Sequence, residues 1–223
     1  MGAEPGEEPL GVGRDAALPG QRLDPAHPSL DEETIGETSG AARDHSARWI
    51  GRLLADAGVT VVILPGNHDP VTADSVYVRG GFDKIPGLSV LGMTDDGAIR
   101  FAQHELEIWG NAHRDYHDMV PLRDPRPRTT RWQVCAGHGH YEPPETFANP
   151  LRPSWLISDE AIEATAADYV ALGHWDRPAQ VGNGAVPAYY SGSPEWARTV
   201  NLVRLTATDG VLVTREMLPA GVV

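Results

Sequence analysis

The sequence predicts an α/β fold, and three observations lead to that class. A helix pattern over His45–Gly58 runs directly into a β-branched run at Val59–Leu64, as in one half of an α/β repeat. Two later apolar runs, Trp132–Ala136 and Tyr169–Leu172, have the length and composition of buried strands. The other strand patterns are short and are separated by turn residues. We therefore expect mixed sheets with a few helices.

The composition sets limits on function. The 223 residues, 41% of them hydrophobic, suffice for one domain with a sizeable core. A net charge of −13, from 18 basic and 31 acidic residues, makes a broad electrostatic grip on nucleic acid unexpected. No run approaches the ~20 apolar residues of a membrane span and the start lacks the parts of a signal peptide, so a cytoplasmic protein is expected. The single cysteine, Cys135, is predicted to be a buried structural thiol.

The chain divides into two parts. Residues 1–44 are rich in Gly, Pro, Glu and Asp and show no sustained period, so they are predicted to be irregular or disordered. Residues 45–223 form the predicted domain. Its first helix carries an apolar face and ends at Gly58, after which the strand Val59–Leu64 begins at once.

The middle of the chain alternates short strands and loops. Apolar segments at Leu88–Met93, Ala98–Phe101 and Leu106–Gly110 predict an antiparallel meander. A loop rich in proline and arginine, Pro121–Arg131, leads to the strand Trp132–Ala136.

The last third begins with an irregular loop at Tyr141–Leu156. A helix is predicted from Ser158, because Asp159 and Glu160 in its first turn suit the positive end of the helix dipole. Beyond the strand Tyr169–Leu172 the chain is rich in β patterns. The final strands are predicted at Ala185–Tyr190, Val200–Leu205 and Val211–Met217, with Thr208-Asp209-Gly210 as the last hairpin turn.

Chemically capable side chains stand where the predicted strands end. Asn67, His68 and Asp69 follow the first strand, and His138 and His174 each follow a glycine at the end of a later one. The carboxyl ends of parallel strands meet at one edge of a sheet, so these residues are expected to converge. Amide oxygen and imidazole ligands without thiolate favour a divalent ion such as manganese, iron or zinc.

These motifs also resemble a known family. Gly66-Asn67-His68-Asp69, Gly137-His138-Gly139 and Gly173-His174-Trp175-Asp176 are similar in order and spacing to the motifs of calcineurin-like metallophosphoesterases. The stretches Asp168–His174 and Tyr190–Pro194 resemble most the SbcD-type DNA repair exonucleases and their bacterial relatives. The resemblance covers about residues 45 to 205. It implies an αββα sandwich of mixed sheets and the hydrolysis of phosphodiester or phosphomonoester bonds.

The resemblance also implies roles for individual residues. Asn67, His138 and His174 would bind one metal ion. Asp176 stands where the family usually has a histidine bound to a second ion. His68 would donate a proton to the leaving group. Asp69 and His140 lie next to the ligands and would either support them or have an ordinary role in a solvated turn.

The implied reaction is attack on phosphorus by water held between two divalent ions. Manganese is the expected ion, with iron, zinc or nickel as alternatives. The substrate would be a phosphoester, either a nucleotide, a small phosphodiester or a DNA end. A partner ATPase of the SbcC type is implied by the resemblance alone, and no membrane partner is expected.

Two earlier family motifs are not intact. The only Asp-x-His, Asp115-Tyr116-His117, falls after the Asn-His motif, and the nearest match to Gly-Asp-x-x-Asp is Gly20–Asp24, where Gln21 replaces the bridging aspartate. The sandwich is therefore expected to lack its first two strands, to expose an edge of the strand Val59–Leu64, and to hold one ion loosely. We expect a truncated or misassigned start, with poor replacement of those strands by the first 45 residues as the alternative.

Two functions from different classes follow. The first is a metal-dependent phosphoesterase impaired by its incomplete dinuclear site. The second is a non-catalytic module that keeps the sheet for binding or regulation. His68 together with three metal ligands favours the first function, and the missing bridging aspartate favours the second.

Overall fold

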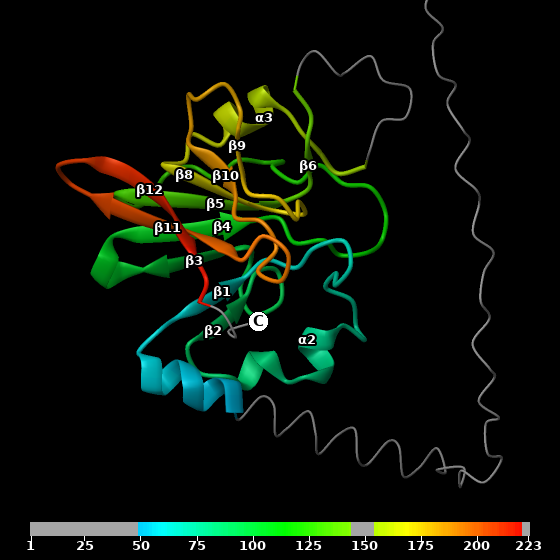
Figure 1. Cartoon of the computed structure of the whole chain (residues 1–223). Coiled ribbons are helices and arrows are strands. Elements are labelled where there is room, and N and C mark those ends of the chain that lie inside the picture. The colour runs from blue at the N-terminus through cyan, green and yellow to red at the C-terminus, as the bar shows by residue number, and fades with distance from the viewer. Residues whose placement is uncertain (1–48, 144–153, 220–223) are drawn as a thin grey trace, which may run out of the picture.

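The computed structural model describes residues 49–143 and 154–219, which form a mixed α/β fold with several sheets and few helices (Figure 1). The predicted irregular segment 1–44 and the stretch Gly20–Asp24 lie outside the described residues. No helix in the described ranges has the length and apolar character needed to cross a membrane.

The largest sheet has six strands in the order β3-β4-β5-β8-β10-β9. Its four central strands run parallel to one another, and an antiparallel strand closes each edge. The four carboxyl ends therefore point to one side of the sheet. The strands are β3 (Ala98–Phe101), β4 (Leu106–Gly110), β5 (Trp132–His138), β8 (Tyr169–Gly173), β9 (Ala179–Val181) and β10 (Ala188–Tyr190).

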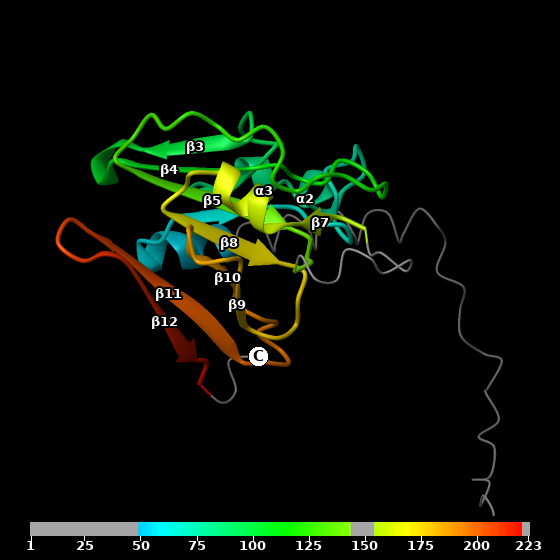
Figure 2. The same ribbon diagram turned by 90° about the horizontal axis from the view of Figure 1, so that it is seen from above.

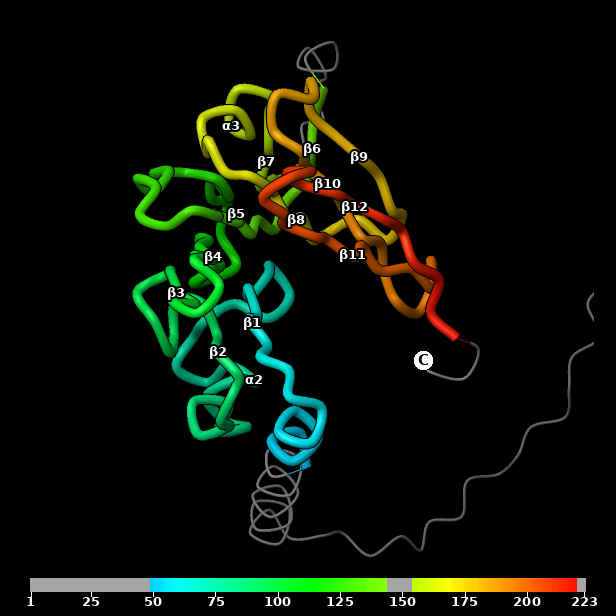
Figure 3. Tube along the Cα trace, turned by 90° about the vertical axis from the view of Figure 1, so that its left-hand side faces the viewer, coloured from blue at the N-terminus to red at the C-terminus, as the bar shows by residue number. Residues whose placement is uncertain are grey.

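A second, two-stranded sheet contains the first predicted strand. Residues 49–57 are helical, and Gly58 ends the helix with φ 60°, a conformation that glycine adopts without strain. β1 (Val61–Ile63) follows and pairs in parallel with β2 (Leu88–Val90). Figure 3 shows this pair and its helices on one side of the larger sheet. Among the described strands β1 pairs with β2 alone, which leaves its other edge open.

The predicted three-stranded meander is wrong in part. β3 and β4 form an antiparallel hairpin as expected, but β2 pairs with β1 and not with β3. The reason is a crossover that sequence patterns did not reveal: α2 (Val76–Arg79) and the 3-10 helix η1 (Phe82–Lys84) return the chain so that β2 lies parallel to β1. A second 3-10 helix, η2 (Ala102–His104), joins β3 to β4.

The last third of the chain matches its predicted elements closely. Ser158 caps α3 (Asp159–Ala164) by accepting a hydrogen bond from the Ala161 N–H. β11 (Thr199–Thr206) and β12 (Gly210–Met217) form the predicted hairpin, which projects from the body of the molecule in Figure 2. The two-residue strands β6 (His140–Tyr141) and β7 (Leu156–Ile157) pair in parallel.

Two clusters of buried hydrophobic residues pack the helices against the sheets. The larger one lies between α3 and the six-stranded sheet and includes Cys135, which is fully buried, as predicted. Burial raises the pKa of the Cys135 thiol, so the thiol stays protonated and structural. The smaller cluster joins β1 and β2 to α2 and contains Tyr77 and Val90.

An apolar groove of about 340 Å³ lies between β1 and the strands β4, β5 and β8. Side chains that alternate along β5 form its floor, since Val134, Ala136 and His138 are only partly buried while the residues between them are buried. The groove is also lined by Val62 of β1 and by Leu64, which follows β1. The groove therefore runs along partly exposed apolar surface to the imidazole of His138.

Candidate metal centre and active site

Strand ends from both sheets bring the candidate residues together. β5 and β8 are neighbours, so His138 and His174 emerge side by side, with ring centroids 5.3 Å apart. The sequence predicts that the strands before His68, His138 and His174 share one sheet edge. That prediction is wrong for β1, the strand before His68, because β1 belongs to the two-stranded sheet. Asn67 reaches the histidines across the groove between the sheets.

The closest contact in the site joins Asn67 to His138. The His138 Nε2–H donates to Asn67 Oδ1 at 2.7 Å, and the Asn67 side chain is buried. Two ligands that lie ~2.1 Å from one ion at about a right angle are separated by about 3 Å. The spacing of this oxygen and this nitrogen therefore suits two neighbouring ligands of one cation.

Two glycines make room for the His138 ring. A Cβ added to Gly66 would lie 2.5 Å from His138 Cε1, and one added to Gly173 would lie 3.0 Å from His138 Nδ1. The strand-end glycines are thus required by packing against this imidazole rather than by an unusual φ.

His174 is held in a strained backbone conformation. Its φ of 111° is one that residues with a side chain rarely adopt, and such residues cluster at functional sites. Its ring also faces His140 with centroids 6.2 Å apart.

His140 has a defined tautomer in this arrangement. The Trp175 indole can only donate, and its Nε1–H lies 3.1 Å from His140 Nδ1, so Nδ1 is the acceptor. The neutral ring therefore carries its proton on Nε2. In that form its Nε2–H is available as a hydrogen-bond donor.

Asp69 holds the turn that carries Asn67 and His68. Its Oδ1 accepts from the Gly66 N–H at 2.9 Å, and its Oδ2 accepts from the hydroxyl of Tyr77 in α2. Both carboxylate oxygens of Asp69 are therefore engaged within the fold.

His113 is a site residue that the sequence reasoning missed. It is fully buried, with its ring centroid 5.5 Å from that of His138, and its Nε2–H donates to the His138 carbonyl at 3.0 Å. Its Nδ1 has no hydrogen-bond partner among the described residues. His113 lies three residues beyond the end of β4 and is not next to a glycine, so the glycine-histidine pattern at strand ends did not include it.

The remaining candidate site residues, His68 and Asp176, lie at the margin of the site. His68 is exposed and within electrostatic reach of His138 and His174. Asp176 is also exposed; it favours protonation of His174 but lines a separate hollow beside Trp196. In the described ranges, no three His, Cys, Asp or Glu side chains already stand close enough to hold an ion. Asn67 and His138 are therefore the only predicted ligands in direct contact.

Desolvation favours the neutral forms of the His138 and His174 imidazoles. Burial, together with the nearby rings of His174 and His113, lowers the pKa of His138 from 6.5 to about 4. Desolvation and three neighbouring histidines also lower the pKa of His174. A neutral imidazole is the form that can donate a lone pair to a metal.

This shift predicts an acid-sensitive fold. The unfolded chain takes up a proton on His138 near pH 6.5 and the folded chain only near pH 4, so stability is full above pH 6.5 and falls between these values. We expect the urea midpoint, measured with EDTA present, to fall from pH 7 to pH 5. His138→Gln should flatten that fall, and an equally steep fall in the variant would contradict the assignment.

Comparisons with known proteins give no independent identification. A scan against protein-family models finds no match, and a search of curated proteins finds none.

Proposed function

We propose that this chain is a metal-dependent phosphoesterase of the calcineurin-like type, with a site that holds one ion. The observation that carries the proposal is the contact between Asn67 and His138, with His174 and the exposed His68 beside it at the carboxyl ends of the strands. An amide oxygen, neutral imidazoles and a free proton carrier are the groups that this chemistry needs.

The finer architecture belongs to the same proposal. Two sheets face each other across the apolar groove, with α3 outside one of them and α2 outside the other. This layering is compatible with an incomplete αββα sandwich. The open edge of β1 is where the missing strands would pair.

The donor set fits a hard or borderline cation. Asn67 Oδ1 and His138 Nε2 would be neighbouring ligands once the His138 ring proton moves from Nε2 to Nδ1, and His174 would approach from β8. Oxygen and nitrogen donors without thiolate suit manganese first, with iron, zinc or nickel as alternatives. When bound, the ion supplies positive charge that activates water and stabilises phosphoryl oxygens.

The protein's own groups supply the rest of the reaction. His68 stands exposed on the turn after β1, where its imidazole can give a proton to the leaving oxygen. Asp69 fixes that turn through Gly66 and Tyr77. The net charge of −13 gives no support for an extended nucleic-acid track, so a nucleotide or small phosphodiester is the preferred substrate over a DNA end.

Manganese titration followed by an activity assay tests the proposal. We expect mass spectrometry and calorimetry to find one manganese ion per chain, and His174→Ala to weaken its binding. Hydrolysis of bis(4-nitrophenyl) phosphate should be slow, abolished by EDTA and restored by manganese. Two tightly bound ions would refute the incomplete site.

A non-catalytic binding module is the second candidate. It is favoured by the absence, among the described side chains, of a preassembled group of three His, Cys, Asp or Glu ligands, and by the open apolar groove beside β1. A purified protein that binds no divalent ion and hydrolyses no phosphoester would exclude the first function and leave the second.

A further inference from the structure

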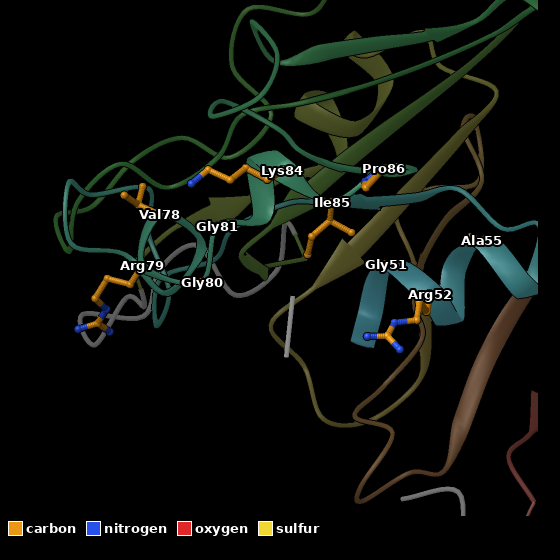
Figure 4. A pocket seen from close by; sticks show the side chains of 10 residues that line it. All are labelled: Gly51, Arg52, Ala55, Val78, Arg79, Gly80, Gly81, Lys84, Ile85 and Pro86. Atoms are coloured by element: carbon orange, nitrogen blue, oxygen red, sulfur yellow. The ribbon is translucent and has the colours of Figure 1, made fainter. Parts of the chain in front are cut away.

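A second pocket lies away from the histidine cluster. It has a volume of about 620 Å³ and is formed by the helix of residues 49–57, the end of α2 and the segment around η1 (Figure 4). It shares no lining residue with the histidine site. α2 separates the two places, because Tyr77 turns toward Asp69 while Val78 and Arg79 line the pocket.

The charge of this pocket is opposite to that of the chain. Three basic side chains, Arg52, Arg79 and Lys84, line it, and among the described residues no aspartate or glutamate does. In Figure 4 they rise from three different elements around the pocket. In the part of the chain that the structure describes, none of the three makes an ion pair. A concentration of free cations in a protein with net charge −13 favours an anionic ligand.

The shape of the pocket limits the choice of ligand further. Val78, Ile85 and Pro86 give it an apolar wall, and Gly80 and Gly81 line it with backbone alone. Its volume falls in the range of small-molecule sites. Guanidinium groups match phosphate oxygens in pairs and an ammonium group adds a point charge. A ligand with several phosphate charges and an apolar ring would satisfy both parts.

We propose that this pocket binds a phosphorylated small molecule of the nucleoside polyphosphate class. Arg52 and Lys84 provide the larger share of the attraction, since Arg79 also lies within electrostatic reach of Asp74. The proposal is independent of phosphoesterase activity, because the pocket contains none of the residues assigned to that reaction.

Lys84 makes a specific test available, since it is the only lysine in the chain. N-hydroxysuccinimidyl acetate will acetylate its ε-amine, and mass spectrometry of the peptide that contains Lys84 measures the rate separately from the N-terminal amine. With EDTA present to prevent hydrolysis, saturating ATP should slow this acetylation about fivefold. Pyrophosphate should protect less, and adenosine or sodium chloride at matched ionic strength should not protect.

Variants identify the partners of the ligand. Arg52→Gln should raise the ATP concentration needed for protection about tenfold, the loss expected for one charge-assisted contact. Arg215→Gln, on the exposed hairpin strand β12, is the matched control and should change nothing. Protection by ATP no greater than by salt, an unchanged response of Arg52→Gln, or stronger protection by duplex DNA at equal phosphate concentration would each overturn the proposal.

Discussion

Gly66→Ala is expected to weaken metal binding strongly while the protein remains folded. The added methyl group would lie 2.5 Å from His138 Cε1, a distance that real Cβ contacts do not reach, so the imidazole must move away from Asn67. Losing the placement of one ligand should lower manganese affinity about 100-fold. Calorimetric titration with manganese measures the loss, and circular dichroism checks the fold.

Two further glycine variants serve as a weaker test and as a control for this result. Gly173→Ala brings a methyl group only to 3.0 Å from His138 Nδ1, so its effect on affinity should be smaller. Gly51→Ala is the matched control. Its new methyl group would meet Ile85 at an ordinary 3.4 Å, and position 51 is in a helix, where alanine is more favourable than glycine. Equal manganese affinity in Gly66→Ala and Gly51→Ala would contradict the arrangement of the site.

His68→Ala is expected to slow hydrolysis and to leave metal binding nearly unchanged. His68 is exposed at the site and is assigned to the leaving group, not to the ion. Loss of a general acid lowers rates about 100- to 10,000-fold when the leaving group needs a proton. A diester with an alkyl leaving group should therefore lose far more activity than one with 4-nitrophenol, which leaves readily as an anion.

The control for this variant is His104→Ala, which removes another exposed histidine from η2. It should leave both the rate and its dependence on the leaving group unchanged. If His68→Ala lowers manganese affinity as much as His174→Ala does, then His68 is a ligand and the division of roles is wrong.

Several elements could be predicted because their signals are local. The helix ending at Gly58, the capped start of α3 after Ser158 and the hairpin turn before Gly210 depend on residues a few positions apart. The strands β5 and β8 were recognisable as continuous apolar runs. The strand-end histidines were noticed for the same reason, since each follows such a run.

Pairing between distant segments was harder to predict. β2 has the pattern of a meander strand, but the crossover through α2 and η1 places it parallel to β1. His113 was overlooked because nothing local shows that β4 lies next to β5 or that its side chain lies against His138. The basic pocket is also nonlocal, since Arg52 and Lys84 come from separate elements.

The sequence by itself determined the α/β class, most strand positions and the residue types that could bind a cation or transfer a proton. Only the tertiary structure decided which of them meet: Asn67 and His138, 71 positions apart, touch across two sheets, while Asp176 lies beside a different hollow. The physical reason is that helix and strand periods are local, whereas the position of one sheet against another depends on packing across the whole core. Gly66 and Gly173 connect the local sequence to the tertiary structure, because their missing side chains leave the space in which the His138 ring lies.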